Sequence, residues 1–112
     1  MNRPSYELRY LPLFCEELDH AVSYITFNLC NPDAADNLID NIEHAILTRL
    51  EAGPESFEQV PSRRKRAHPY YRIYIRNYVI YYVVLEENGH KIMEVRRLLH
   101  ILENREKKLK SD

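Results

Sequence analysis

Two stretches of helical periodicity, joined by three residues, most strongly constrain the fold of this chain. In both, apolar residues recur so that they share one helical face. The first stretch, residues 13–30, carries Phe14, Leu18, Ala21, Val22, Ile25 and Leu29 on that face. The second ends at Gly53 and carries Ala35, Leu38, Ile42, Ala45, Ile46 and Leu50. Because Asn31-Pro32-Asp33 between them suits a helix stop and restart, we expect an antiparallel helical hairpin.

The remaining apolar pattern has the period of two that indicates β-strands. One strand is expected before the helices, where Tyr6, Leu8 and Tyr10 alternate with charged residues. Three more are expected after residue 70, separated by turns at Arg76-Asn77 and at Glu87-Asn88-Gly89. The sequence therefore predicts an α+β domain of order β-α-α-β-β-β, with the helical hairpin packed on one face of a mainly antiparallel four-stranded sheet.

The size of the chain fits one domain, since 112 residues, 45% of them hydrophobic, can bury a core. We assign residues 1–102 to this domain and residues 103–112 to a polar C-terminal tail. The N-terminus lacks a secretory pattern and no apolar run is long enough to cross a bilayer. We expect a cytoplasmic protein with no membrane contact, no metal and no cofactor.

The net charge of −1 conceals an uneven distribution along the chain. Residues 1–53 carry three basic and nine acidic side chains, hence −6, whereas residues 54–112 carry thirteen basic and eight acidic, hence +5. The run Arg63-Arg64-Lys65-Arg66 lies in a proline-containing loop of the basic half. Such a run attracts phosphate, although a solvated loop or a docking site for an acidic protein segment has the same composition.

Several segments resemble the RelE/ParE superfamily of toxins, over roughly residues 5–100. The similar segments are Leu18-Asp19, Tyr24-Ile25, Asn31–Ala35, Pro69–Ile73, Asn77–Tyr82 and Val95–His100. The resemblance implies the toxin of a bacterial type II toxin–antitoxin pair, neutralised by a cognate antitoxin. RelE-like members cleave mRNA, usually in the ribosomal A site and without metal, whereas ParE-like members inhibit DNA gyrase and are not nucleases. We predict an mRNA endonuclease acting on the ribosome, with a gyrase inhibitor or an inactive interaction protein as alternatives.

Metal-free RNA cleavage requires a base for the 2′-OH, cations for the developing charge and an acid for the leaving oxygen. The resemblance points to Arg72 for charge stabilisation and to His100 as acid or phosphate contact. In a regular last strand Arg97 would share a side with Val95 and Leu99 and need a partner, leaving Arg96 free to meet RNA. The predicted catalytic residues are Arg72, Arg96 and His100, and the predicted RNA-binding residues are Arg63, Arg64, Lys65 and Arg66.

Each of these assignments has a structural alternative. Arg72 could pair with a carboxylate such as Glu94, and His100 could be structural, as in ParE-like proteins without nuclease activity. The sheet tyrosines could stack on bases, but most are expected to be core. Many relatives also carry an arginine three residues after the final His or Tyr, where this chain has Glu103, with Arg105 two residues later.

Overall fold

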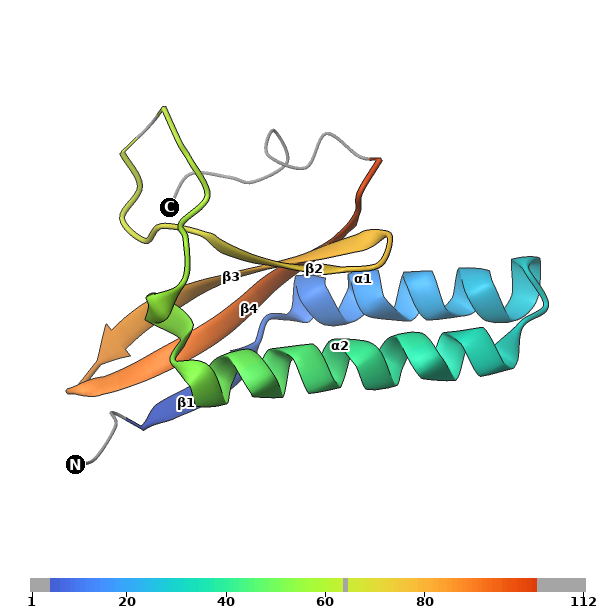
Figure 1. Cartoon of the computed structure of the whole chain (residues 1–112), viewed down its shortest axis with the longest axis horizontal. Coiled ribbons are helices and arrows are strands. Elements are labelled where there is room, and N and C mark those ends of the chain that lie inside the picture. The colour runs from blue at the N-terminus through green and yellow to red at the C-terminus, as the bar shows by residue number, and fades with distance from the viewer. Residues whose placement is uncertain (1–4, 64, 103–112) are drawn as a thin grey trace.

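The computed structural model describes residues 5–63 and 65–102, with two helices on one side of a four-stranded sheet (Figure 1). Its elements are β1 Tyr6–Tyr10, α1 Pro12–Ser23, a π-helical turn Tyr24–Asn28, α2 Pro32–Ala52, a 3₁₀ turn Pro54–Ser56, β2 Tyr71–Ile75, β3 Tyr78–Glu87 and β4 His90–His100. This order confirms the predicted α+β fold. The predicted tail, residues 103–112, lies outside the described residues.

The ends of the helices follow from their local sequence. The side chain of Asn31 accepts a hydrogen bond from the backbone N–H of Ala34 at 3.1 Å and caps α2, which then begins at Pro32. Gly53 ends α2 at φ 100°, a conformation that L side chains rarely adopt. The first predicted helix is present as α1, but it continues into the π-helical turn over its last residues.

The strand order in the sheet is β1-β4-β3-β2. Strands β2, β3 and β4 form the expected antiparallel meander, while β1 pairs in parallel with β4, so the sheet is mixed. The β3–β4 turn places Asn88 at φ 53° and Gly89 at φ 80°, as a two-residue hairpin turn requires. The β2–β3 turn instead places an arginine, Arg76, at φ 51°.

An irregularity in β4 changes which of its side chains face the helices. Tyr82 pairs with Val95 and Tyr81 pairs with Arg97, so Arg96 is the extra residue of a β-bulge. Beyond the bulge, Leu98 rather than Arg97 packs into the core beneath the helices. The expectation of a regular strand, with Arg97 on the side of Val95, is therefore wrong, whereas Arg97 and Leu99 still share a side because the pairing is regular between them.

The main core lies between the helical hairpin and the sheet. Its buried residues are Phe14, Ala21, Leu38, Ile42, Ile46, Tyr71, Ile73, Ile80, Tyr82, Met93, Val95 and Leu98. The apolar faces predicted for α2 and β2 therefore pack in this core, as do Phe14, Leu18, Ala21 and Ile25 of the first helix. The prediction that Leu29 shares this buried face is wrong, because Leu29 lies at the closed end of the hairpin and is 56% exposed. Most of the sheet tyrosines were expected in the core, and four of them are buried: Tyr70, Tyr71, Tyr81 and Tyr82. Tyr74 is 50% exposed.

Replacing Leu38 or Ile42 by alanine should lower the free energy of unfolding by about 2–5 kcal/mol, because each substitution leaves a cavity in this core. Denaturant unfolding measures the change. The matched control is Ile39→Ala in the same helix, since Ile39 is 38% exposed and should lose far less. Equal losses at Ile39 and Leu38 would mean that the buried face of α2 is misassigned.

Candidate functional site

The side of the sheet away from the helices, called here the loop face, is crossed by the loop of residues 57–70 (Figure 1). Val60 and Tyr70 of the loop pack against a second buried cluster on the sheet. The sheet residues of this cluster are Val79, Tyr81, Val83 and Leu99. The basic loop is therefore fixed to the sheet at Val60 and at Tyr70, on either side of its basic run.

Arg49 fixes the beginning of the loop. Its guanidinium lies 3.6 Å from the ring centroid of Phe57 and donates hydrogen bonds to the Tyr82 hydroxyl at 2.9 Å and to the Arg72 carbonyl at 3.4 Å. The Tyr82 hydroxyl in turn donates to the Pro54 carbonyl at 2.7 Å. Burial raises the pKa of Tyr82 to about 12, so this hydroxyl stays protonated and keeps its role as donor.

An ion pair holds the same segment to the edge of the sheet. Lys91 of β4 donates to the Glu55 carboxylate, which also accepts a hydrogen bond from the Tyr6 hydroxyl at 2.9 Å. The hydrogen bond from Lys91 is the main cause of a lowered pKa for Glu55. The carboxylate therefore remains charged at neutral pH and links the 3₁₀ turn to both β1 and β4.

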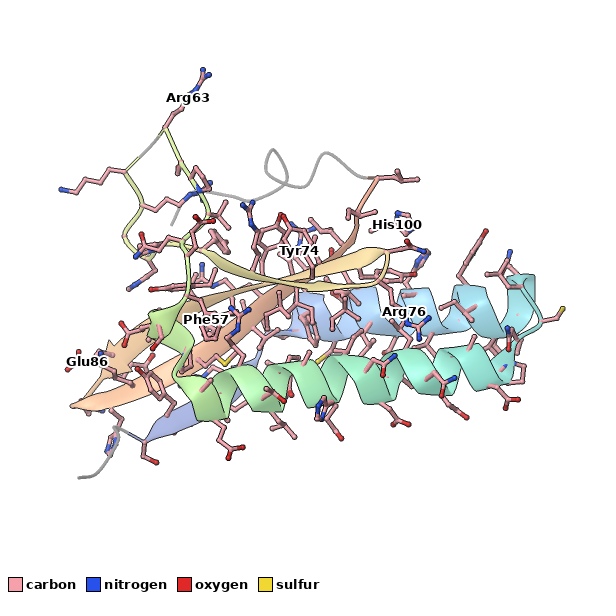
Figure 2. The ribbon with its side chains drawn as sticks, viewed as in Figure 1. Phe57, Arg63, Tyr74, Arg76, Glu86 and His100 are labelled. Carbon is pink, nitrogen blue, oxygen red and sulfur yellow. The ribbon has the colours of Figure 1, made fainter. Side chains whose placement is uncertain are left out.

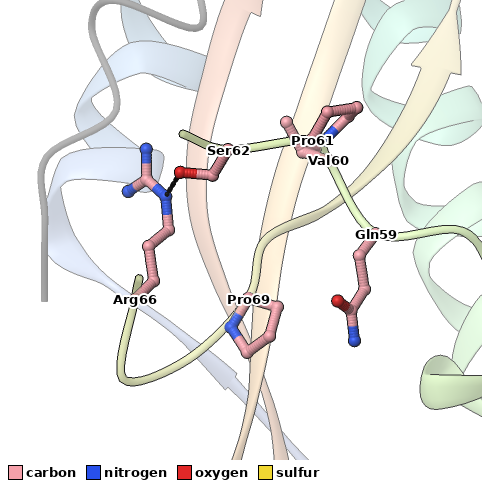
Figure 3. A pocket seen from close by; sticks show the side chains of 6 residues that line it. All are labelled: Gln59, Val60, Pro61, Ser62, Arg66 and Pro69. Atoms are coloured by element: carbon pink, nitrogen blue, oxygen red, sulfur yellow. Dashed lines mark hydrogen bonds between the residues drawn. The ribbon is translucent and has the colours of Figure 1, made fainter. Parts of the chain in front are cut away.

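Tyr70 fixes the end of the loop between two arginines. The guanidinium of Arg66 lies 5.1 Å from the Tyr70 ring centroid and that of Arg96 lies 5.8 Å away. Arg66 also donates to the Ser62 hydroxyl at 3.2 Å, beside a hollow of about 320 Å³ (Figure 3). Its other lining residues are Gln59, Val60, Pro61 and Pro69.

The predicted RNA-binding run is thus divided between different environments. Arg63 and Lys65 are exposed, whereas Arg66 is half-buried against Tyr70. Figure 2 shows Arg63 at the outer end of the loop, away from the helices. Arg64 lies outside the described residues.

Arg72 lies on the loop face, as its alternation with Tyr71 and Ile73 predicted. Its guanidinium is 5.6 Å from the ring centroid of Tyr74, its exposed neighbour on the same strand face. Glu94, the partner suggested by the sequence, bonds to other arginines. The Arg96 Nε donates to it at 2.9 Å, and an Arg9 nitrogen lies 3.5 Å from its second oxygen.

The prediction that Arg96 would be free for RNA is wrong. The Arg96 guanidinium bonds to Glu94, a carboxylate that is 5% exposed, and also donates to the Tyr70 hydroxyl at 3.4 Å. A buried carboxylate needs such a partner, because desolvation penalises its charge. The charge of Arg96 therefore balances an internal carboxylate.

Arg97 has the partner that the sequence required. Its guanidinium donates to both oxygens of Glu17 in α1, at 3.1 and 2.7 Å, and Glu17 also accepts the backbone N–H of Leu98 at 2.9 Å. β1 is the neighbour of β4 on this edge of the sheet, and it ends at Tyr10, which pairs with Val95. The Glu17 carboxylate therefore accepts the Leu98 N–H beyond the end of β1. Sequence reasoning missed both Glu17 and Arg49. The signal was their spacing on apolar helix faces, since Glu17 lies three residues after Phe14 and Arg49 three residues after Ile46.

His100 lies on the helix side of the sheet, opposite to Arg72. It pairs across the strands with Tyr78, their ring centroids are 5.3 Å apart, and Tyr78 packs against the main core. Its Nδ1 accepts the backbone N–H of Leu102 at 3.2 Å. His100 and Tyr78 line a groove of about 590 Å³ with His20 and Tyr24 of the helical hairpin. The structure therefore does not bring His100 together with the two predicted catalytic arginines.

Arg96→Ala should destabilise the protein by about 1–3 kcal/mol, because it removes the closest partner of a buried carboxylate. Arg76→Ala removes the same kind of side chain from an exposed position in the β2–β3 turn and should change stability by no more than about 0.5 kcal/mol. Thermal and denaturant unfolding of the two variants test this difference. Equal losses would show that Glu94 does not depend on Arg96.

Glu17→Ala should cost about 1–3 kcal/mol, because Arg97 and the Leu98 N–H lose their shared acceptor. The control is Glu16→Ala, one residue earlier and exposed. The double variant with Arg97→Ala measures the coupling between the two side chains. A Glu17 variant as stable as the Glu16 variant would exclude this role.

No helix among the described residues is long and apolar enough to cross a membrane.

Comparison with known proteins identifies the family to which the chain belongs. No significant match was found among curated proteins or among solved structures. Residues 8–104 match the family model described as the ParE toxin of the type II toxin–antitoxin system parDE. The chain therefore belongs to this ParE toxin family and is the toxin of a type II toxin–antitoxin system, in which its partner is an antitoxin.

Proposed function

We propose that this toxin acts by binding DNA gyrase, as ParE-like members do, and not by cleaving mRNA. The observation that carries the proposal is the separation of His100 from Arg72 on opposite sides of the sheet. An acid or base and a stabilising cation must both reach the same phosphate for cleavage. A toxin that inhibits by binding needs no such convergence.

The charges of the other candidate cations support the same conclusion. Arg96 is paired with buried Glu94, and Arg97 is bonded twice to Glu17. A guanidinium that already balances a carboxylate contributes less to a developing negative charge. Removing it from that carboxylate would also leave a desolvated anion behind.

The helical hairpin offers a surface suited to a protein partner. Its closed end extends beyond the sheet, as Figure 1 shows. This end carries three large exposed side chains, with Tyr24 50% exposed, Phe27 75% and Leu29 56%. Apolar and aromatic side chains gathered on an exposed surface are typical of protein–protein contacts, where they supply most of the binding energy.

One observation favours the endonuclease instead. Arg72 and Tyr74 share the loop face with the basic loop, where a cation and a ring could engage RNA. Under this second candidate function, Arg72 would stabilise charge on the scissile phosphate. His100, the predicted acid, lies on the other side of the sheet, so the endonuclease stays a prediction for the biochemical test to decide.

The purified toxin should inhibit DNA supercoiling by gyrase and should not cleave mRNA on ribosomes. Arg72→Ala and His100→Ala should inhibit gyrase like the unmodified toxin. Phe27→Ser should weaken inhibition by on the order of tenfold, because it removes an exposed aromatic anchor. Leu47→Ser, at a 45% exposed leucine in the C-terminal half of α2, is the control and should have little effect.

The opposite pattern would overturn the proposal. In that case supercoiling is unaffected, mRNA is cleaved in the presence of ribosomes, and cleavage falls on the order of 10²-fold in well-folded Arg72→Ala. Retained folding of each variant is checked by thermal unfolding.

A further inference from the structure

We propose that the loop face, residues of β2 together with the basic loop, binds single-stranded nucleic acid as a ligand. This property is separate from gyrase inhibition, because it uses the side of the molecule opposite the helical hairpin. It accounts for the basic loop, which the proposed function leaves unused.

The cations of this face come from two segments that the fold brings together. Arg63, Lys65 and Arg66 belong to the loop, and Arg72 belongs to β2. Val60 and Tyr70 pack the loop onto the buried cluster of the face on which Arg72 lies, and the Arg66 guanidinium lies against the Tyr70 ring. The phosphate backbone is the polyanion that such a group of cations attracts, and this attraction provides affinity without sequence preference.

An exposed aromatic ring lies beside Arg72 on this face. Tyr74 is 50% exposed, on the edge strand of the sheet, with the Arg72 guanidinium 5.6 Å from its ring centroid. In Figure 2, Tyr74 lies on the side of the sheet away from the helices, toward the loop that carries Arg63. A half-exposed ring beside a guanidinium is the kind of platform on which an unpaired base stacks. Bases within a duplex are stacked on each other, so this ring favours a single strand.

The supporting contacts keep the face in place before any ligand arrives. Arg49 and Phe57 hold one end of the loop, and Tyr70, between Arg66 and Arg96, holds the other. A preformed site loses less conformational entropy on binding than a flexible basic segment does.

The distribution of charge also orients a nucleic acid toward this face. The exposed side of α2 carries Asp36, Asp40 and Glu43, whose charges repel phosphate. A strand that approaches the molecule is therefore directed away from the helices and toward the loop. An acidic peptide would be attracted by the same cations but would gain nothing from base stacking on Tyr74.

The test is fluorescence anisotropy of the full-length toxin with labelled poly(U) and poly(dT) of about 12 nucleotides, beginning at roughly 50 mM salt. A DNA duplex of equal length and poly-glutamate serve as competitors. Both single strands should bind, with an affinity that falls as salt rises at a log–log slope of about −2, because a few phosphates are contacted. The duplex and poly-glutamate should compete at least tenfold less well than unlabelled poly(dT).

Variants separate the charge from the ring. Tyr74→Leu should weaken binding about tenfold, whereas Tyr74→Phe should bind like the unmodified toxin, because phenylalanine retains the stacking surface. The double variant Arg63→Ala/Lys65→Ala should reduce the salt slope. Tyr24→Ala removes an equally exposed tyrosine from the helical hairpin, and Arg76→Ala removes an exposed cation that lines a hollow beside α2. Neither control should change binding.

Three results would overturn the proposal: no binding of either strand at the lowest salt, tighter binding of the duplex or of poly-glutamate, or equal affinities of Tyr74→Leu and Tyr74→Phe. Supercoiling inhibition by the same preparations is measured in parallel. Tyr74 belongs to β2 and Phe27 to the π-helical turn of the hairpin, so the two properties use different residues. A toxin that inhibits gyrase but binds no nucleic acid would therefore refute this inference and leave the proposed function intact.

Discussion

The burial of β3 on both of its faces is the constraint on which the rest of the structure depends. Ile80 and Tyr82 are fully buried beneath the helices, and Val79, Tyr81 and Val83 are fully buried on the other side. The helical hairpin covers only one of these faces. The second face would expose a large apolar surface unless another segment covered it, and the loop does so through Val60 and Tyr70. Burial of the central strand thus determines where the basic loop lies.

Aromatic rings fix the arginines that connect the loop to the sheet. Arg49 stacks on Phe57, and Tyr70 lies between Arg66 and Arg96. Such contacts bury the apolar part of a guanidinium while its edge stays available for hydrogen bonds. These contacts explain how a loop that buries an apolar sheet face can also contain arginines close to that face. Aliphatic side chains in place of the rings would offer the guanidinium groups no such contact.

The elements of the fold could be predicted from the sequence because each depends on local pattern: two apolar helical faces, the Asn31-Pro32 junction and alternating strands. The side of the sheet occupied by Arg72 could also be predicted, from its alternation with Tyr71 and Ile73. The partners of Arg49, Arg96 and Arg97 could not, because they depend on contacts between segments far apart in the chain. The sequence pattern indicates that a charged residue on an apolar face needs a partner, but it does not identify that partner.

The bulge at Arg96 had the largest effect on the predicted site. In a regular strand, alternate residues share a side, so Arg96 and His100 would both face the loop together with Arg72. The one extra residue in β4 reverses this alternation, and His100 then packs against Tyr78 on the helix side. The residue types that RNA cleavage requires are thus present in the sequence, but one backbone irregularity separates them. A motif in this family can therefore indicate a nuclease only when the register of the last strand is also known.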